Sequence, residues 1–190
     1  RAMLSGVLSH VARLLDASTS LNNLLSITVG IAVRIVGAER GTLFLLDPET
    51  GELFSRVMHG NEVEEIRLSP GSSIACAIMA SGQAEIITDA YGDVRFNKEI
   101  DRQSGFVTKS ILAVPLRVAG SDIPVGVIEL LNKTSGEFTP ADLAAVADIS
   151  GNAAAALRNA RDLELTRRAR ESEDRMQEVT AAYGLTLVRD

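Results

Sequence analysis

The sequence contains one cysteine, no tryptophan, two histidines and only 4% aromatic residues. A single cysteine, Cys76, excludes an internal disulfide framework and a zinc ribbon. It also favours a reducing compartment, so we expect the protein in the cytoplasm. His10 and His59 are far apart, and neither has a second soft ligand nearby, so we expect neither a metal site nor a haem. The core should therefore be aliphatic and free of metal.

Positive charge and long apolar runs are also scarce. The formal net charge of the 190-residue chain is −6, which gives no electrostatic reason to bind nucleic acid or an anionic membrane. No apolar run approaches the length that spans a bilayer. The basic residues near the C-terminus alternate with acids, a pattern typical of a solvated helix. The length suits one domain with an extension.

Catalytic motifs are missing as well. The sequence holds no phosphate-binding loop of the P-loop or Rossmann kind and no G-x-S-x-G elbow. Cys76 lies in the apolar segment 73–82, where a buried structural thiol is the simplest interpretation. We therefore expect a binding module with no catalytic residues and no required cofactor.

Apolar spacing predicts two helices in the first 37 residues. The first covers residues 3–15, and the segment "DASTS" (16–20) then breaks the pattern and offers caps at 18–20 for the second. Gly37 is a plausible C-cap. The side chains expected on the inward face of the second helix are Leu21, Leu24, Leu25, Thr28, Ile31, Ala32 and Ile35.

The middle of the chain is predicted to consist mainly of strands. Two extended runs flank "DPETG" (47–51), which predicts a β-hairpin. A short strand follows in 63–68, a short helix in 73–82 and an extended segment in 83–90. The polar stretch from residue 93 to 109 is expected to be a loop, and the strands 110–118 and 124–133 come after it. Antiparallel strands with helices at both ends predict an α+β class.

A long helix is expected from Pro140 to about residue 183, with Thr139 as its cap. Its second half is highly charged. A weak heptad seam, typical of a coiled coil, follows Leu165, Ala169, Ser172, Met176, Val179 and Tyr183.

Five segments in order carry a family resemblance: 38–47, 69–91, 105–116, 125–133 and 138–142. Over roughly residues 21–160 the chain resembles a GAF domain, particularly the cyclic-nucleotide-binding ones of phosphodiesterases and adenylyl cyclases. The resemblance implies an antiparallel sheet of about six strands with helices on one face and a long C-terminal signalling helix. It also implies an N-terminal dimerisation helix (1–17), the GAF domain (18–160) and a coiled-coil helix (161–190).

A dispersed motif of that family is present in part. Asn132, Lys133, Phe138 and Asp142 match it, whereas Leu143 replaces its final Glu. The resemblance implies a structural salt bridge between Lys133 and Asp142 that closes the fold beneath the pocket. Removing one partner of such a pair would damage fold and binding together.

The resemblance also implies the ligand-binding positions. They comprise two strand residues, two residues opening the short helix, four residues of a lid segment (97–108) and a pair after the second strand: Thr42, Glu129, Ile74, Ala75, Asn97, Asp101, Ser104, Thr108, Met58 and His59. In cGMP-selective relatives that pair is Phe-Asp, where Phe stacks on the base and Asp reads the guanine edge. Met58 stacks less well and neutral His59 cannot replace the carboxylate, so cAMP is favoured over cGMP.

The implied function is a non-catalytic sensory module of a bacterial signalling protein. It would be a homodimer through its terminal helices, with an output domain attached elsewhere in the full protein. Three alternatives remain open: a ligand-free dimerisation spacer, a sensor of another small metabolite, and an enzyme that reduces methionine sulfoxide through cysteines. Bilin attachment at Cys76 is disfavoured, because Ala77 follows where a His is common.

Overall fold

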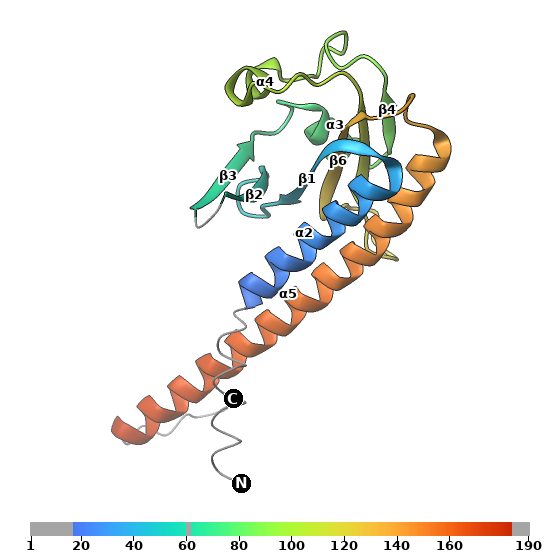
Figure 1. Cartoon of the computed structure of the whole chain (residues 1–190). Coiled ribbons are helices and arrows are strands. Elements are labelled where there is room, and N and C mark those ends of the chain that lie inside the picture. The colour runs from blue at the N-terminus through green and yellow to red at the C-terminus, as the bar shows by residue number, and fades with distance from the viewer. Residues whose placement is uncertain (1–16, 60–61, 184–190) are drawn as a thin grey trace.

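A six-stranded antiparallel sheet forms the centre of the molecule (Figure 1). The computed structural model describes residues 17–59 and 62–183, and the strand order is β3-β2-β1-β6-β5-β4. The strands are β1 (Ala38–Leu46), β2 (Leu53–His59), β3 (Glu62–Leu68), β4 (Glu85–Ile87), β5 (Ile111–Leu116) and β6 (Gly126–Lys133). The helices are α2 (Ala17–Val36), α3 (Ile74–Ser81), α4 (Lys98–Ser104) and α5 (Pro140–Tyr183). The predicted α+β class and six-stranded sheet are confirmed.

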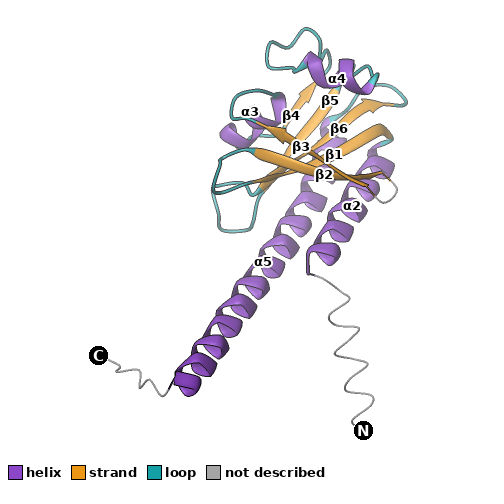
Figure 2. Cartoon of the chain, turned by 90° about the vertical axis from the view of Figure 1, so that its left-hand side faces the viewer, coloured by secondary structure: helices purple, strands orange, loops and turns teal. Residues whose placement is uncertain are grey.

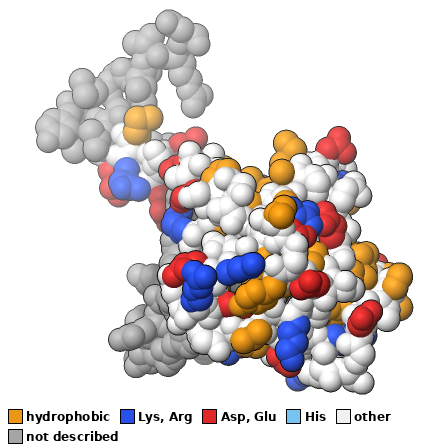
Figure 3. Space-filling model, turned by 90° about the horizontal axis from the view of Figure 1, so that it is seen from above, with side chains coloured by type: hydrophobic (Ala, Val, Ile, Leu, Met, Phe, Trp, Pro, Cys, Tyr) orange, Lys and Arg blue, Asp and Glu red, His pale blue; other side chains and the backbone are white. Residues whose placement is uncertain are grey.

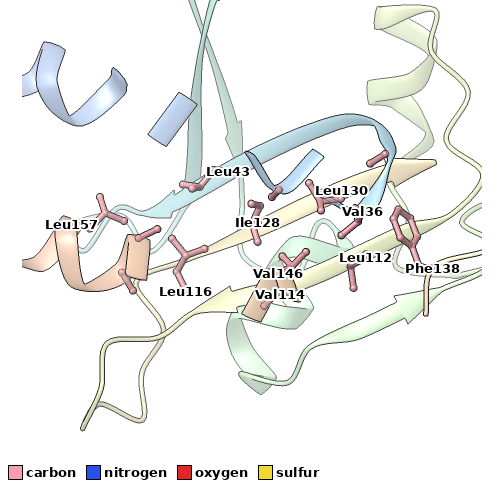
Figure 4. Packing of buried hydrophobic residues seen from close by; sticks show 14 of the residues in the cluster. Val36, Leu43, Leu112, Val114, Leu116, Ile128, Leu130, Phe138, Val146 and Leu157 are labelled. Carbon is pink, nitrogen blue, oxygen red and sulfur yellow. The ribbon is translucent and has the colours of Figure 1, made fainter. Parts of the chain in front are cut away.

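The helices α2 and α5 cover one face of this sheet and lie side by side, and α5 continues well past the sheet (Figures 1 and 2). Alternate residues of β1, β5 and β6 point to this face and form an aliphatic core with the two helices (Figure 4). Gly41 permits the close approach of α2, because a Cβ there would lie 2.7 Å from the Val33 side chain. The labelled core residues are Val36, Leu43, Leu112, Val114, Leu116, Ile128, Leu130, Phe138, Val146 and Leu157.

The opposite face of the sheet carries α3, and α4 with its flanking loops lies at one end (Figure 2). A second cluster of buried side chains packs here, contributed by all six strands and by α3. Its members include Phe44, Ile74, Ile78, Ala113 and Val127. One face of the sheet therefore packs against the long helices, and the other carries the predicted ligand positions on β1, β6 and α3.

Two predictions for the N-terminal helices are wrong. Residues 18–20 do not cap a helix, because they already lie within α2. Ile31 and Ile35 are exposed, whereas Leu25, Thr28 and Ala32 lie inward as expected. The helix is apolar on two sides, so periodicity did not identify which side meets the sheet. The predicted helix at 3–15 lies outside the described residues.

A further correction concerns the polar stretch after residue 93, where residues 98–104 form α4 instead of a loop. Asn97 caps it by accepting the Glu99 N–H at 3.1 Å, and Gly105 ends it in the left-handed conformation at φ 68°. Both signals are visible in the sequence, but seven polar residues provide no apolar stripe by which to detect a helix.

The long helix α5 begins as predicted. Thr139 Oγ1 accepts the Asp142 N–H at 3.2 Å, and Asp142 Oδ2 accepts the Thr139 N–H at 2.7 Å, a reciprocal capping box. The helix continues through residue 160 without a break, so the proposed boundary there stays a prediction. Of the six heptad positions, Ser172 and Met176 are exposed, and the other four side chains are outside the described part.

Candidate functional site

Thr42 and Glu129 lie directly opposite each other on neighbouring strands. Thr42 of β1 pairs with Glu129 of β6, and Glu129 in turn pairs with Ala113 of β5. Because Leu43 and Ile128 face the long helices, Thr42 and Glu129 face the other side of the sheet. Thus Thr42, Glu129 and Ala113 form a short row under α3. Ala113 is fully buried in the cluster that α3 covers.

The N-terminus of α3 lies over this row. Ser73 caps the helix and accepts the Cys76 N–H at 3.2 Å, and the Ala75 N–H lies close enough to the Glu129 carboxyl group to lower its pKa. Ile74 and Ala75 are buried. The fold thus brings Ala75 and Glu129 into contact and places Thr42 beside them, although the three lie far apart in sequence.

Glu129 is the electrostatically unusual residue of this region. Desolvation raises its pKa to about 7, and the Ala75 N–H opposes that rise only in part. Yet the residue keeps some accessible surface. A buried carboxyl group with a raised pKa is more frequent at functional sites than elsewhere, which makes Glu129 a candidate for such a role.

The lid segment (97–108) is held together by Asp101. This buried carboxylate accepts the Thr108 N–H at 2.6 Å and the Thr108 hydroxyl at 2.8 Å. The Tyr91 hydroxyl donates to the same carboxylate at 3.1 Å. Burial and this hydrogen bond raise the pKa of Tyr91. Asp101 therefore links α4 to Thr108 and to Tyr91.

Asn132, at the end of β6, fixes the far end of the lid. It has the positive φ of 54° and is the only such non-glycine residue in the described part of the chain. Its Oδ1 accepts the N–H groups of Lys109 and Ser110, and its Nδ2 donates to the Val107 carbonyl and to Glu39. All four hydrogen-bonding positions of the amide are used. The sequence motif marks this residue, but its contact with the lid could not be read from it.

The next two residues tie the same strand to both long helices. Lys133 Nζ donates to Asp142 Oδ2 in the first turn of α5, as the resemblance implies. Burial alone would raise the pKa of Asp142, but Lys133 and Thr139 outweigh it and hold that pKa below its usual value. Thr134 donates its N–H and hydroxyl to the Gly37 carbonyl, at the junction of α2 and β1. Residues 132–134 therefore contact the lid, α5 and α2 in succession.

Comparison with known proteins identifies this arrangement. Residues 20–157 match the GAF domain family. The chain belongs to the GAF family. The GAF domain of a phosphoenolpyruvate-protein phosphotransferase from Coxiella burnetii has the same fold, with a TM-score of 0.66 at 19% identity over 76% of this chain and 86% of that one. GAF domains are small-ligand sensory modules in general, and they are usually regulatory.

Two other proteins bear on function. A probable 3′,5′-cyclic phosphodiesterase of Caenorhabditis elegans is 32% identical over 152 residues, which cover 73% of this chain and 21% of that protein. The chain thus spans about a fifth of that relative. A type II free methionine-R-sulfoxide reductase from Thermoplasma acidophilum shares the fold, with a TM-score of 0.59 at 16% identity over 73% of this chain and 93% of that one.

The GAF resemblance implies ten ligand-binding residues, and the structure places eight of them in two groups. Thr42, Glu129, Ile74 and Ala75 gather around the start of α3. Asp101 and Thr108 bind each other, while Asn97 and Ser104 serve the two ends of α4, where the Ser104 hydroxyl donates to the Asp101 carbonyl. The side chains of Met58 and His59 are outside the described part of the chain.

Within residues 17–59 and 62–183 no group of three or more His, Cys, Asp or Glu side chains could hold a metal ion. Cys76 is buried, and its thiol donates to the Ser69 carbonyl at 3.3 Å. None of the described helices is both long and apolar enough to cross a membrane. Seen from above, acidic, basic and hydrophobic side chains are interspersed, with no field of one sign (Figure 3).

Proposed function

We propose that this GAF domain is the non-catalytic sensory module of a bacterial signal-transduction protein and binds a cyclic nucleotide. The observation that carries the proposal is the meeting of Ala75, Glu129 and Thr42 on the sheet face opposite the long helices. The N-terminus of α3 offers an anionic phosphate a favourable dipole. Glu129 and Thr42 offer polar partners to hydroxyl groups. The kinship with a probable cyclic phosphodiesterase supports this choice of ligand.

The same proposal favours cAMP over cGMP. The positions that read guanine in cGMP-selective GAF domains hold Met58 and His59 in this sequence. Guanine presents N–H donors that a carboxylate accepts well, and neither residue supplies a carboxylate. Adenine does not need that acceptor, so the missing carboxylate should weaken the binding of cGMP more than the binding of cAMP.

We also propose that the domain is a cytoplasmic homodimer through α2 and α5. Ile27, Ile31 and Ile35 form a row on α2 at intervals of four residues, and 59%, 38% and 58% of their surfaces are exposed. Residues four apart lie on one helix face, so the row is a continuous apolar stripe next to α5. A second copy of the chain can cover it, and the heptad seam of α5 would extend the contact. A conformational change caused by ligand binding would then be transmitted through these helices to an attached output domain.

Binding experiments distinguish this proposal from two alternative functions. A ligand-free spacer would dimerise without binding any nucleotide, and a sensor of another metabolite would bind neither cAMP nor cGMP. The third alternative, a sulfoxide reductase, shares the fold of the Thermoplasma enzyme. It has only one cysteine to use, however, and that thiol is buried and hydrogen-bonded. Absence of methionine sulfoxide reduction by the purified protein would remove this alternative.

The test is a calorimetric titration of refolded, ligand-free protein with cAMP and with cGMP. We expect saturable binding of cAMP with micromolar or tighter affinity and weaker binding of cGMP. Thr42→Val removes the hydroxyl beside Glu129 at nearly constant volume and should weaken cAMP binding. Thr50→Val, in the exposed turn of the first hairpin, is the matched control and should bind like wild type. No heat with either nucleotide at millimolar concentration would refute the proposal.

A further inference from the structure

Strand β6 stops alternating between the two faces of the sheet at Asn132. Up to that point its side chains follow the two-residue period of a strand. Leu130 packs in the cluster between the sheet and the long helices (Figure 4), and Leu131 packs against the cluster between the sheet and α3. The same period would direct Asn132 toward the long helices and Lys133 toward α3. In the structure both side chains make other contacts.

Asn132 turns toward the lid segment, and Lys133 turns toward α5. The Asn132 amide forms three hydrogen bonds to backbone groups of residues 107–110, at 2.6, 2.9 and 3.3 Å. Lys133 Nζ donates to the Asp142 carboxylate in the first turn of α5. The two side chains thus exchange the directions that regular alternation would give them. The cause is the φ of 54° at Asn132, which is left-handed, whereas a regular strand is extended.

The left-handed conformation of Asn132 depends on its hydrogen bonds. A residue with a Cβ adopts this region at a cost in free energy, and it stays there only where its surroundings hold it. Three of the four hydrogen bonds of the amide go to residues 107–110, and the fourth goes to Glu39. If residues 107–110 move away, a single side-chain hydrogen bond remains, and the extended conformation becomes the more stable one.

Thr134 continues the connection to the second long helix. Its N–H and its hydroxyl donate to the Gly37 carbonyl at 2.8 and 2.9 Å. Gly37 lies between the end of α2 and the start of β1. A change of backbone conformation at Asn132 redirects the two residues that follow it, so it acts on contacts of both long helices.

We propose that Asn132 is a conformational switch through which the lid segment (97–108) controls the attachment of α5 and α2 to the sheet. In one state Asn132 is left-handed, and the contacts of Lys133 and Thr134 with the helices are made. In the other state the lid segment is released, Asn132 is extended and Lys133 leaves α5. The equilibrium between two such states responds to whatever opens or closes the lid segment. This inference goes beyond the proposed function, because it requires no particular ligand.

Native-state hydrogen exchange of the whole chain, measured for each amide by NMR, tests this inference. Asp101→Ala releases the lid segment, because it removes the acceptor of the Thr108 N–H and hydroxyl. We expect the Thr134 amide to exchange at least about tenfold faster in this variant, relative to amides in the middle of β6 that report global unfolding. The Thr134 amide donates to Gly37 rather than to the lid segment, so a purely local effect would not reach it.

Arg95→Met is the matched control. It breaks the ion pairs of Arg95 with Glu85 on β4 and with Asp93 in the loop before α4, and it leaves the contacts of Asn132 in place. Exchange at Thr134, relative to the middle of β6, should remain as in wild type.

Asn132→Gly tests the role of the backbone conformation itself. Glycine adopts positive φ about as readily as negative φ, so Lys133 and Thr134 can keep their contacts without the lid segment. In the Asn132→Gly background, Asp101→Ala should therefore not accelerate exchange at Thr134 any further.

The coupling should also act in the reverse direction, because linked equilibria are reciprocal. Lys133→Met removes the ammonium group and keeps most of the apolar stem. It should accelerate exchange at the Thr108 amide several-fold relative to the middle of β6. If Asn132→Gly fails to fold, as judged by circular dichroism, this measurement and the comparison of Asp101→Ala with wild type decide the question.

Three outcomes would overturn the inference. The first is unchanged relative exchange at Thr134 in Asp101→Ala, or at Thr108 in Lys133→Met. The second is an equal acceleration at Thr134 in Arg95→Met. The third is an acceleration by Asp101→Ala that is as large in the Asn132→Gly background as in wild type, since the coupling would then take another route. None of these measurements uses a ligand, so they stand apart from the test of cyclic-nucleotide binding.

Discussion

Thr108 donates both its backbone N–H and its hydroxyl to the buried carboxylate of Asp101, at 2.6 and 2.8 Å. Thr108 lies seven positions after Asp101, so the pair holds the chain that follows α4 back against this helix. These two hydrogen bonds fix the conformation of the segment without any ligand. Ligand binding would then have to adjust or open a preformed element.

Asp101→Ala should open the lid. It leaves the two Thr108 donors without their acceptor, which costs about 2 kcal/mol if they remain buried. We expect faster hydrogen exchange at the Thr108 amide and a lower urea midpoint. Tyr91→Phe removes only the third hydrogen bond and should change both quantities less. Unchanged exchange at Thr108 in Asp101→Ala would show that the pair does not hold the lid.

Asn132 should be needed both for its conformation and for its amide. Asn132→Ala loses four hydrogen bonds and places an alanine at φ 54°, so we expect a loss of about 2–4 kcal/mol in the free energy of unfolding. Asn132→Gly restores the conformational freedom but not the hydrogen bonds, and should fall between alanine and wild type. Denaturant unfolding measures all three. Equal stability of the alanine and glycine variants would exclude the conformational part.

Glu129 should make the stability of the domain depend on pH. Its folded-state pKa of about 7 lies above the ordinary 4.5, so the unfolded chain releases the proton first. Wild-type stability should therefore fall as pH rises from about 4.5 to about 7 and stay low above that range. Glu129→Gln lacks this loss, and at pH 8 it should be more stable than wild type by about 2–3 kcal/mol.

The check is a pair of urea unfolding series at pH 4 and pH 8. The variant and the wild type should be equally stable at pH 4. A difference of the same size at both pH values would mean that packing, not ionisation, separates the two proteins.

The exposed row on α2 should hold the dimer together. Ile31→Lys places a charge at the centre of the row and should convert the dimer to a monomer without unfolding it, because Ile31 makes part of no buried cluster. Ile123→Lys, in the loop between β5 and β6, changes an isoleucine that is 69% exposed and serves as the control. Sedimentation equilibrium measures both. A monomeric wild type, or a dimeric Ile31→Lys, would refute this interface.

Much of the fold could be predicted from local signals. The "DPETG" turn identified the hairpin, Thr139 and Pro140 located the start of α5, and the apolar run ending at Gly82 identified α3. Each signal is a short-range preference of the backbone, so the sequence alone carries it. The family was likewise predictable from the order of several weak segments, and the comparison confirmed it.

Local signals could not predict which side of α2 faces the sheet, nor the hydrogen-bond partners of the residues in segment 97–108. Helix α2 carries Thr28 and Ala32 on one side and Ile27 and Ile31 on another, so hydrophobic spacing alone favoured both. The inward side is decided by the tight contact at Gly41, which depends on the assembled sheet.

The candidate site, too, could be predicted only in part from the sequence. The sequence named Asp101, Thr108, Glu129 and Ala75 by resemblance, but not how they would pair. In the structure Asp101 and Thr108 bind each other, and Glu129 lies near the N-terminus of α3. Such pairings depend on the distance between elements in space, which local patterns do not contain.

The most direct test of the central claim is an amide chemical-shift titration of ¹⁵N-labelled protein with cAMP. The account predicts saturable shifts that concentrate at Ala75, at Thr42 and Glu129, and along the lid up to Thr108, with smaller shifts in α5. Shifts confined to other surfaces, or none at millimolar cAMP, would contradict a cyclic-nucleotide site between α3, the sheet and the lid.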